Sequence, residues 1–299
     1  MAGKRMELKK DLKEKRELIN IVLDRFLPRK DEYPKDIHKA MRHTLFAGGK
    51  RLRPYLTVKT FELFNDNTEI VKPVAAAIEL LHTYTLIHDD LPEIDNDDYR
   101  RGRKACHLVY GPDIALLAGD SLLTYAFSML VSENIEFDNS LRLKLIREFT
   151  HETGDRGIIA GQFIDIKSEG KKVSKKTLKY IHENKTVRLI KLAIRFGAYV
   201  AGASKEHLKR LEKFGHKIGL AFQIVDDILD VEGSAKKMGK TIGKDEKSEK
   251  ATYPSIYGME ESKRMAKELI DDAKEIIAYY GEKSRLFLML ADFIYTRKF

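Results

Sequence analysis

Hydrophobic side chains recur at helical spacing along almost the whole chain of 299 residues. Leu8, Leu12 and Ile19 begin a three-and-four rhythm that Pro28 ends. The same rhythm covers residues 73–90, 112–132, 141–153, 174–201 and 205–231, and both halves of the C-terminal region. Runs with period-two alternation, the mark of a half-buried strand, are not evident. The pattern therefore predicts an all-α fold without a sheet, and the nearly all-apolar residues 113–131 predict a central helix enclosed by others.

No repeat of fixed period and no linker rich in proline, glycine or serine divides the chain. We therefore expect a single domain over residues 1–299. The most irregular stretch, residues 233–254, is rich in glycine and lysine. Long loops inside compact domains are more often functional than idle, although a solvated surface excursion is the simpler alternative.

Composition narrows the class of protein. Hydrophobic residues make up 43% and charged residues 34%, as in a soluble globular chain, and no run of eighteen uncharged apolar residues predicts a membrane span. The N-terminus has no apolar signal region, and the single cysteine, Cys106, rules out an internal disulfide. Together these features predict a cytoplasmic protein.

The formal charge of +9 is compatible with nucleic acid, an anionic membrane or phosphorylated small molecules as partner. Nucleic-acid binding favours a dense basic stripe with interleaved aromatic residues, whereas here acids are mixed with the basic residues over most of the chain. We therefore expect no nucleic-acid partner and no stable membrane insertion.

An acidic cluster lies on the predicted helix of residues 205–231. Gln223, Asp226, Asp227 and Asp230 stand at i, i+3, i+4 and i+7, so they share one face. Like charges four residues apart destabilise a helix, and a cation bound between the oxygens would remove that conflict. Mg²⁺ takes oxygen ligands of this kind together with substrate phosphate. The alternative is a solvated acidic face.

A second acidic cluster, earlier in the chain, contains Asp89, Asp90 and Asp95. Asp89 and Asp95 are six residues apart, which puts them on different sides of an ideal helix. Pro92 lies between them, so we expect the helix to bend or end there and a turn to bring Asp95 back. A calcium loop starting at Asp95 would need glycine at its sixth position, where Arg100 stands, so that interpretation fails.

Basic residues lie in two segments, one directly after the cluster of Asp89, Asp90 and Asp95 and one earlier in the chain. Arg100 and Arg101 follow the first acidic cluster directly, and arginine forks bind phosphate oxygens in a bidentate way. Lys50 and Arg53 follow the glycine pair 48–49, which lets the backbone approach an anion closely. Neutralisation of nearby acids and a surface turn are the simpler alternatives.

A third basic segment resembles a nucleotide-binding loop without being one. In residues 233–241 five residues separate the two glycines where the P-loop pattern needs four, and the segment follows an acidic helix instead of a buried strand. We therefore reject nucleotide binding and keep Lys240, Lys244 and Lys250 as candidate diphosphate ligands.

Together, and in this order, these segments resemble the motifs of the trans-isoprenyl diphosphate synthases, most closely the bacterial type of farnesyl diphosphate synthase. The resemblance covers most of the chain, from Gly48 to about Tyr253. The motifs that carry it are Gly-Gly-Lys-Arg-Leu-Arg-Pro at 48–54, the two aspartate clusters, Arg100-Arg101-Gly102, and the lysine-bearing segment 240–254.

The resemblance implies the all-α isoprenoid synthase fold, with helices around a central catalytic cavity. It further implies a Mg²⁺-dependent prenyltransferase that joins isopentenyl diphosphate to an allylic diphosphate, and a homodimer. A terpene cyclase is less favoured because cyclases lack the motif at 48–54, and a non-catalytic partner subunit would be expected to lose aspartates that are present here.

Roles follow by position from the resemblance. The metal ligands would be Asp89, Asp95 and Asp226, supported by Asp90, Asp230 and Asp227. The allylic diphosphate would be held by Arg100, Lys185 and Lys240. Isopentenyl diphosphate would be held by Lys50, Arg53, His82 and Arg101, with Lys250 as a further substrate ligand. Thr186 and Gln223 would line the path of the carbocation.

Product length in this family depends on the residues ahead of the first aspartate motif. Tyr84 precedes Asp89 by five residues, about 7.5 Å along a helix, and an aromatic side chain there resembles the farnesyl-length enzymes. Ideal helix geometry instead puts Thr85 nearest the Asp89 face. Geranylgeranyl and geranyl products therefore stay open. The basic C-terminal residues 296–299 are similar to a tail that can cover the pocket.

Overall fold

The computed structural model describes residues 2–132, 137–238 and 251–296. In this part of the chain it is helical nearly throughout, with a single two-stranded antiparallel ribbon, so the prediction of an all-α fold is confirmed. The ribbon pairs β1 (Tyr99–Arg100) with β2 (Arg103–Lys104), and in this detail the expectation of no sheet is wrong. A strand pair of this length leaves no period-two run to detect.

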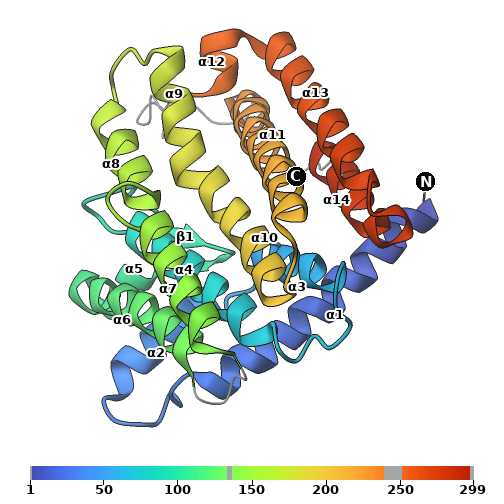
Figure 1. Cartoon of the computed structure of the whole chain (residues 1–299). Coiled ribbons are helices and arrows are strands. Elements are labelled where there is room, and N and C mark those ends of the chain that lie inside the picture. Colours follow the sequence, from blue (N-terminus) through green and yellow to red (C-terminus); the bar gives the residue numbers. More distant parts are fainter. Residues whose placement is uncertain (1, 133–136, 239–250, 297–299) are drawn as a thin grey trace. The chain divides into compact units, whose positions relative to one another are not determined.

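The chain groups into two compact units. Figure 1 labels the helices from which they are built. The first unit comprises residues 1–8, 148–195 and 203–299, and the second comprises residues 9–147 and 196–202. The single domain expected over residues 1–299 stays a prediction, and each unit is described by itself.

The second unit is built around α4 (Lys72–Asp89), which packs most extensively against α6 (Pro112–Val131). Its other helices are α2 (Lys35–Leu45), α3 (Leu52–Glu62), α5 (Cys106–Tyr110), most of α1 (Ala2–Phe26) and the start of α7 (Asn139–Thr153). Gly119 allows the close approach of α6 to α4, because a Cβ there would meet the His88 ring, with Cε1 at 3.2 Å. The buried face of α4 is apolar from Pro73 to Leu81, with Glu79 as its one buried carboxylate.

The prediction that residues 113–131 form a helix enclosed on all sides is wrong for this structure. Only 39% of the apolar window of α6 is buried, and Leu116, Leu117 and Val131 are 46%, 50% and 46% exposed. By length and composition α6 is also the one described helix that could cross a membrane, a test that core helices of soluble proteins pass as well. The helix therefore has one packed side and one apolar side toward solvent.

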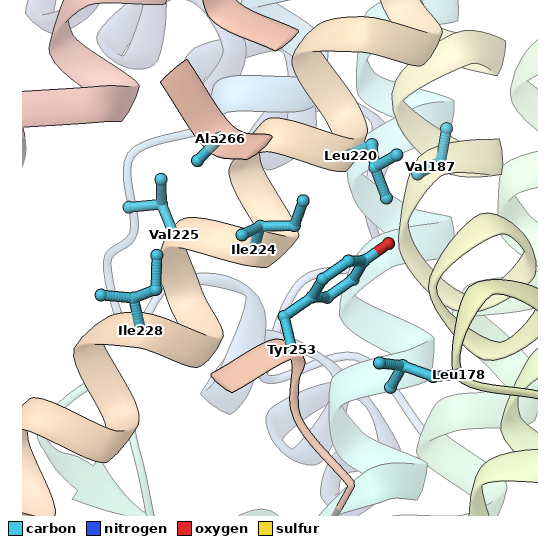
Figure 2. Packing of buried hydrophobic residues seen from close by; sticks show 8 residues of the cluster. All are labelled: Leu178, Val187, Leu220, Ile224, Val225, Ile228, Tyr253 and Ala266. Carbon is cyan, nitrogen blue, oxygen red and sulfur yellow. The ribbon is translucent and has the colours of Figure 1, made fainter. Parts of the chain in front are cut away.

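The first unit is built around α11 (Lys205–Met238), which runs beside α13 (Met259–Ala278) and also packs against α14 (Arg285–Thr296). Phe214 of α11 and Phe287 of α14 meet edge to face, with ring centroids 5.6 Å apart. The unit also contains α8 (Ile158–Ser168), α9 (Lys175–His182), a 3-10 turn η2 (Gly281–Ser284) and the short helix α12 (Tyr253–Tyr257). Figure 2 shows Tyr253 of α12 beside Ile224 and Leu220 of α11, with Leu178 of α9 on the other side and Val187 beyond Leu220.

The helix expected over residues 174–201 is interrupted. Five residues, Glu183–Val187, form a π-helix (η1) between α9 and α10 (Arg188–Val200). A π segment inserts a residue into the helical repeat and rotates the side chains that follow, and such segments are frequent at functional sites. Apolar spacing alone gave no sign of it because the amphipathic pattern continues on both sides.

Candidate active site

The first aspartate cluster lies where α4 ends. The helix stops at Asp89, and Pro92 follows in a tight turn. In that turn the amide of Asp95 donates to the carbonyl oxygen of Asp89 at 2.8 Å, and the amide of Asn96 donates to that of Leu91 at 3.0 Å. The turn that was expected to bring Asp95 back to Asp89 is therefore confirmed. Both aspartates are partly exposed, and this hydrogen bond holds their backbones together at one place in the second unit.

Asp90 differs from Asp89 in its surroundings. Its residue is 1% exposed, and its Oδ1 accepts from Arg100 Nε at 2.8 Å and from Arg100 Nη2. Burial raises the pKa of Asp90, while Arg100 opposes that shift. Arg100 Nη2 also donates to Asp97 at 2.8 Å. Asp90 therefore holds the guanidinium of Arg100 against the aspartate turn, a use of a carboxylate that needs no metal.

The basic turn at residues 48–51 precedes α3 in the same unit. Lys50 is exposed and Arg53, on the first turn of α3, is partly buried. Arg53 Nη1 donates to His82 Nε2 of α4 at 3.2 Å. Desolvation, and then the positive charge of Arg53, lowers the pKa of His82 well below its usual value. His82 is therefore neutral at pH 7, and the excess charge at this place comes from lysine and arginine, which suits a diphosphate.

The second aspartate cluster lies on α11 of the first unit. Asp226 is partly exposed and Asp230 is exposed, whereas Asp227 is 4% exposed. Asp227 accepts from Gln223 Nε2 at 2.9 Å and from the backbone amide of Tyr253 at 2.8 Å. Burial raises the pKa of Asp227 to about 7, against the effect of these two hydrogen bonds. The four residues predicted to share one face thus divide, because Asp227 is buried while Gln223 and Asp226 are partly exposed and Asp230 is exposed.

The π-helix presents two further predicted residues beside this cluster. Thr186 Oγ1 donates to Gln223 Oε1 at 2.8 Å, which joins η1 to α11. Lys185 Nζ donates to Asp165 of α8 at 2.7 Å. Gly161 makes this approach possible, because a Cβ there would lie 2.8 Å from the Asn184 carbonyl carbon and nearer still to the Lys185 amide nitrogen. Lys185, Thr186 and Gln223 therefore form one arrangement within the first unit.

Within residues 2–132, 137–238 and 251–296, no group of three or more histidine, cysteine or carboxylate side chains is arranged to hold a metal ion. The donors of each cluster by itself nevertheless suit Mg²⁺, which typically uses one or two carboxylates together with phosphate. Asp89 and Asp95 offer such oxygen ligands in the second unit, and Asp226 offers them in the first. Lys240, Lys244 and Lys250, and residues 297–299 of the C-terminal tail, lie outside the described residues.

Comparison with known proteins identifies the family. The Polyprenyl synthetase family profile matches residues 34–281. The chain is a polyprenyl synthetase. It is 43% identical to the geranylgeranyl diphosphate synthase of Cyanophora paradoxa over 96% of this chain and 95% of that one. It is 41% identical to the farnesyl diphosphate synthase of Geobacillus stearothermophilus over 94% and 91% of the two chains.

Solved structures agree with the fold. The apo structure of an FPP/GFPP synthase from Zymomonas mobilis matches with a TM-score of 0.87 at 32% identity, covering 98% of this chain and all of the other. The resemblance drawn from the motifs is therefore confirmed, and the chain is a trans-prenyl diphosphate synthase. Its relatives carry names for both farnesyl and geranylgeranyl products, so product length is a separate question.

Tyr84 and Thr85, the two candidate residues for product length in this synthase, differ from each other in their surroundings. Tyr84 is 9% exposed, and its ring meets the His88 ring edge to face at 4.9 Å. His88 in turn faces α6, where its Nε2 lies 3.0 Å from the Leu116 carbonyl oxygen. Thr85 is partly buried, and its hydroxyl donates to the His82 carbonyl oxygen at 2.8 Å. Tyr84 therefore fills space between α4 and α6, while Thr85 is bonded to its own helix.

Three residues without a role predicted from the sequence form ion pairs at the site of this synthase. Glu79 and Arg51 form a buried ion pair at 2.6 Å, and Asp165 is the partner of Lys185. Glu79 could have been noticed, because a lone carboxylate inside an apolar helical run needs a cationic partner. Asp165 and Arg51 gave no such signal, since charged residues at turns and on helix surfaces are common.

A surface hollow of about 410 Å³ in the first unit is separate from these groups. It is lined by Lys191, Lys209, Glu212, Lys213, His216, Lys217 and Ile276, none of which belongs to a predicted motif. Glu212 forms an ion pair with Arg195, and Lys217 forms one with Asp272. The hollow is therefore a lysine-rich surface between α10, α11 and α13.

Proposed function

We propose that this synthase joins isopentenyl diphosphate to dimethylallyl and then geranyl diphosphate, and stops at farnesyl diphosphate. The observation that supports farnesyl diphosphate as the end product is the buried ring of Tyr84, five residues ahead of Asp89 and packed against His88. A buried ring packed against a neighbouring side chain cannot turn aside for a growing chain, because core side chains are packed closely in fixed rotamers. A geranylgeranyl product is the alternative, and the relative from Cyanophora paradoxa bears that name.

Departure of the allylic diphosphate is the step that the aspartate clusters and their cations serve. We propose that Asp89 and Asp95 at the first cluster, and Asp226 with Asp230 at the second, are the ligands of Mg²⁺. When bound, Mg²⁺ supplies positive charge that stabilises the departing diphosphate. Arg100 donates hydrogen bonds to the same leaving group, and as the allylic carbon–oxygen bond breaks, its electron pair leaves with the diphosphate.

Three groups of the first unit act on the leaving group and on the carbocation in this proposal. Lys185, held at 2.7 Å from Asp165, binds the diphosphate, and its place is fixed before substrate arrives. Thr186 and Gln223 are joined at 2.8 Å, and they present an oxygen-lined surface that stabilises the carbocation. Such preorganised dipoles need no rearrangement when charge develops.

Isopentenyl diphosphate is the nucleophile in this scheme. Lys50, Arg53 and Arg101, with the neutral ring of His82, hold its diphosphate and orient the double bond. The π electrons form the new carbon–carbon bond with the allylic cation, and a proton is then lost to the released diphosphate. No nucleophilic serine or cysteine is needed, and the work of the protein is to position two substrates for a bimolecular step.

Product analysis tests the proposal directly. The protein is incubated with isopentenyl diphosphate, Mg²⁺, and dimethylallyl, geranyl or farnesyl diphosphate in turn, and the dephosphorylated alcohols are separated by chromatography. Farnesol as end product supports the proposal, and Tyr84→Ala should then lengthen the product. Geranylgeraniol from the wild type would exclude Tyr84 as the stop, and no condensation with any primer would exclude the catalytic function.

We also propose a homodimer, as the resemblance implies. The apolar side of the second unit that faces solvent includes Leu108 and Val109 of α5 and Leu116 and Leu117 of α6, each between 45% and 50% exposed. Burial of such side chains against a second copy removes apolar surface from water. Light scattering should give twice the chain mass of 34.4 kDa, and Leu117→Asp should halve it. A wild-type monomer would refute the dimer.

A further inference from the structure

Two loops that carry isopentenyl-binding residues share an unusual backbone feature. Arg51, in the basic turn, has φ of 52°, and Arg101, in the ribbon turn, has φ of 54°. The left-handed region is unfavourable for residues with a Cβ, and it persists only where the surroundings hold it. Arg51 directly follows Lys50 and comes two residues before Arg53, while Arg101 is itself assigned to isopentenyl diphosphate. Whatever holds Arg51 and Arg101 therefore also holds the residues assigned to that substrate.

The same carboxylate oxygen receives both arginines. Glu79 Oε1 accepts from Arg51 Nη1 at 2.6 Å and from Arg101 Nη2 at 3.3 Å. Glu79 and Arg51 are 1% and 3% exposed, so water does not replace either contact. Gly49 completes the packing, because a Cβ there would lie 2.8 Å from the guanidinium carbon of Arg101. Glu79 thus joins two turns that are 50 residues apart in sequence, as counted from Arg51 to Arg101.

The other bonds of the two arginines extend this anchor. Arg51 also donates to the Asn20 side chain at 3.1 Å and to the Leu45 carbonyl oxygen, and Arg101 donates to the Thr44 carbonyl oxygen at 3.5 Å. The pKa of Arg101 is lowered, first by burial and also by Arg51, while Glu79 acts in the opposite direction. Without Glu79 the two guanidinium groups would repel one another in a poorly solvated place.

We propose that Glu79 is a positioning residue for isopentenyl diphosphate, which fixes the turns at Arg51 and Arg101 so that Lys50, Arg53 and Arg101 converge on one diphosphate. The inference rests on the proposed function. It predicts a selective defect, because Arg100, assigned to the allylic diphosphate, has its own anchors in Asp90 and Asp97. Loss of Glu79 should therefore weaken binding of one substrate and spare the other.

Steady-state kinetics of Glu79→Gln with each substrate varied in turn is the test. The KM for isopentenyl diphosphate should rise at least about tenfold, since a displacement near 1 Å can cost about a hundredfold. The KM for geranyl diphosphate should change less than about threefold, because the anchors of Arg100 are untouched. An unchanged KM for isopentenyl diphosphate, or an equal rise for both substrates, would overturn the proposal.

Glu152→Gln is the matched control. Glu152 is also a buried carboxylate bound by two arginines, Arg188 at 2.6 Å and Arg195 at 2.5 Å, and it lies in the first unit. Its loss should lower the melting temperature, as loss of Glu79 should, while the KM for isopentenyl diphosphate stays at the wild-type value. If Glu152→Gln raises that KM equally, the effect follows from lost stability and Glu79 has no positioning role.

A double variant separates positioning from charge balance. Glu79→Gln combined with Arg51→Gln restores the local charge but leaves the basic turn without its anchor. The melting temperature should then recover toward that of the wild type while the KM for isopentenyl diphosphate stays raised. Recovery of both values would show that Glu79 only balances charge.

Calorimetric titration with isopentenyl diphosphate alone keeps this test apart from the proposed function. If the wild type binds isopentenyl diphosphate but condenses no primer, the proposed condensation reaction is wrong. A loss of affinity for isopentenyl diphosphate of at least about tenfold in Glu79→Gln would still support the positioning role of Glu79. Equal affinities in wild type and variant would overturn the anchor whether or not condensation occurs.

Discussion

Gly161→Ala tests whether the close contact between α8 and the π-helix positions Lys185. The added methyl would lie 2.8 Å from the Asn184 carbonyl carbon and nearer to the Lys185 amide nitrogen. These are backbone atoms, so no side chain can rotate to make room. Ordinary carbon contacts lie near 3.5–4.0 Å, so α8 must retreat by roughly 1 Å.

Two opposing terms set the size of the effect on stability. Overpacking of this kind costs about 1–3 kcal/mol. Replacing glycine by alanine inside a helix gains up to about 1 kcal/mol in helix propensity. With the full gain, the net loss is about 0–2 kcal/mol, which should lower the melting temperature by up to roughly 8 °C.

The effect on activity should be larger than the loss of stability suggests. A retreat of α8 separates Asp165 from Lys185, whose side chains are now 2.7 Å apart, and Lys185 loses its fixed place. Misplacement near 1 Å can cost about a hundredfold in rate. We expect kcat/KM for geranyl diphosphate to fall between about tenfold and a hundredfold, measured by release of labelled prenyl product under conditions where the protein is fully folded.

Two controls make the result interpretable. Gly215→Ala adds the same methyl to α11, where the nearest atom is the flexible end of the Ile194 side chain at 3.0 Å, so stability should change little or rise. Phe287→Leu, on α14, removes the ring packed on Phe214 and should lower stability without touching α8. If Gly161→Ala loses no more activity than Phe287→Leu at equal stability, the contact does not position Lys185 and the reasoning fails.

Three further predictions concern single polar groups. Burial lowers the pKa of His182 to about 4 from an ordinary 6.5, so its neutral form stabilises the fold fully above pH 6.5 and that contribution is lost as pH falls toward 4. At about 1.4 kcal/mol per unit of pKa shift, the loss in unfolding free energy reaches about 3 kcal/mol. In urea titrations between about pH 7 and 4.5, the unfolding free energy of His182→Gln should therefore decline less than that of the wild type. Parallel curves for the two proteins would contradict this prediction. Asp90→Asn should release Arg100 and raise the KM for geranyl diphosphate about tenfold, since a hydrogen bond to a charged group is lost; an unchanged KM would show that the pair is not needed. His82→Gln keeps a neutral acceptor for Arg53 and should leave the KM for isopentenyl diphosphate within about threefold, whereas His82→Leu should raise it about tenfold, and equal values for both variants would contradict that role.

Much of the fold could be predicted because apolar spacing and proline punctuation are local signals. Pro92 marked the end of α4 and the turn that returns Asp95 to Asp89, and both are present. The π-helix at residues 183–187 could not be predicted, because apolar spacing carries no sign of it and the segment that packs against it, α8 at Gly161, is remote in sequence. The exposed side of α6 was misjudged for a similar reason, since an apolar helix does not reveal how many neighbours cover it.

The aspartates show the same limit at the level of single side chains. Each cluster contains an aspartate pair, and in each pair the second member is buried, Asp90 at 1% and Asp227 at 4% exposure. Asp90 holds Arg100, and Asp227 accepts from Gln223 and from the Tyr253 amide. A sequence pattern weighs all the aspartates alike, because burial and bonding partners come from elements far along the chain.

This division bears on what substitutions in the clusters would mean. Loss of activity in an Asp90 or Asp227 variant would not by itself identify a metal ligand, because each of these carboxylates is already bonded to a group assigned to bind substrate or carbocation. The partly exposed Asp89 and Asp226 are the better candidates for metal ligands, because only accessible oxygens can exchange water for a cation and a phosphate. Metal affinity should therefore respond to Asp89→Asn and Asp226→Asn more than to Asp90→Asn and Asp227→Asn. Titration of Mn²⁺ binding by electron paramagnetic resonance, in the presence of inorganic diphosphate, measures this directly, and equal losses in all four variants would refute the division.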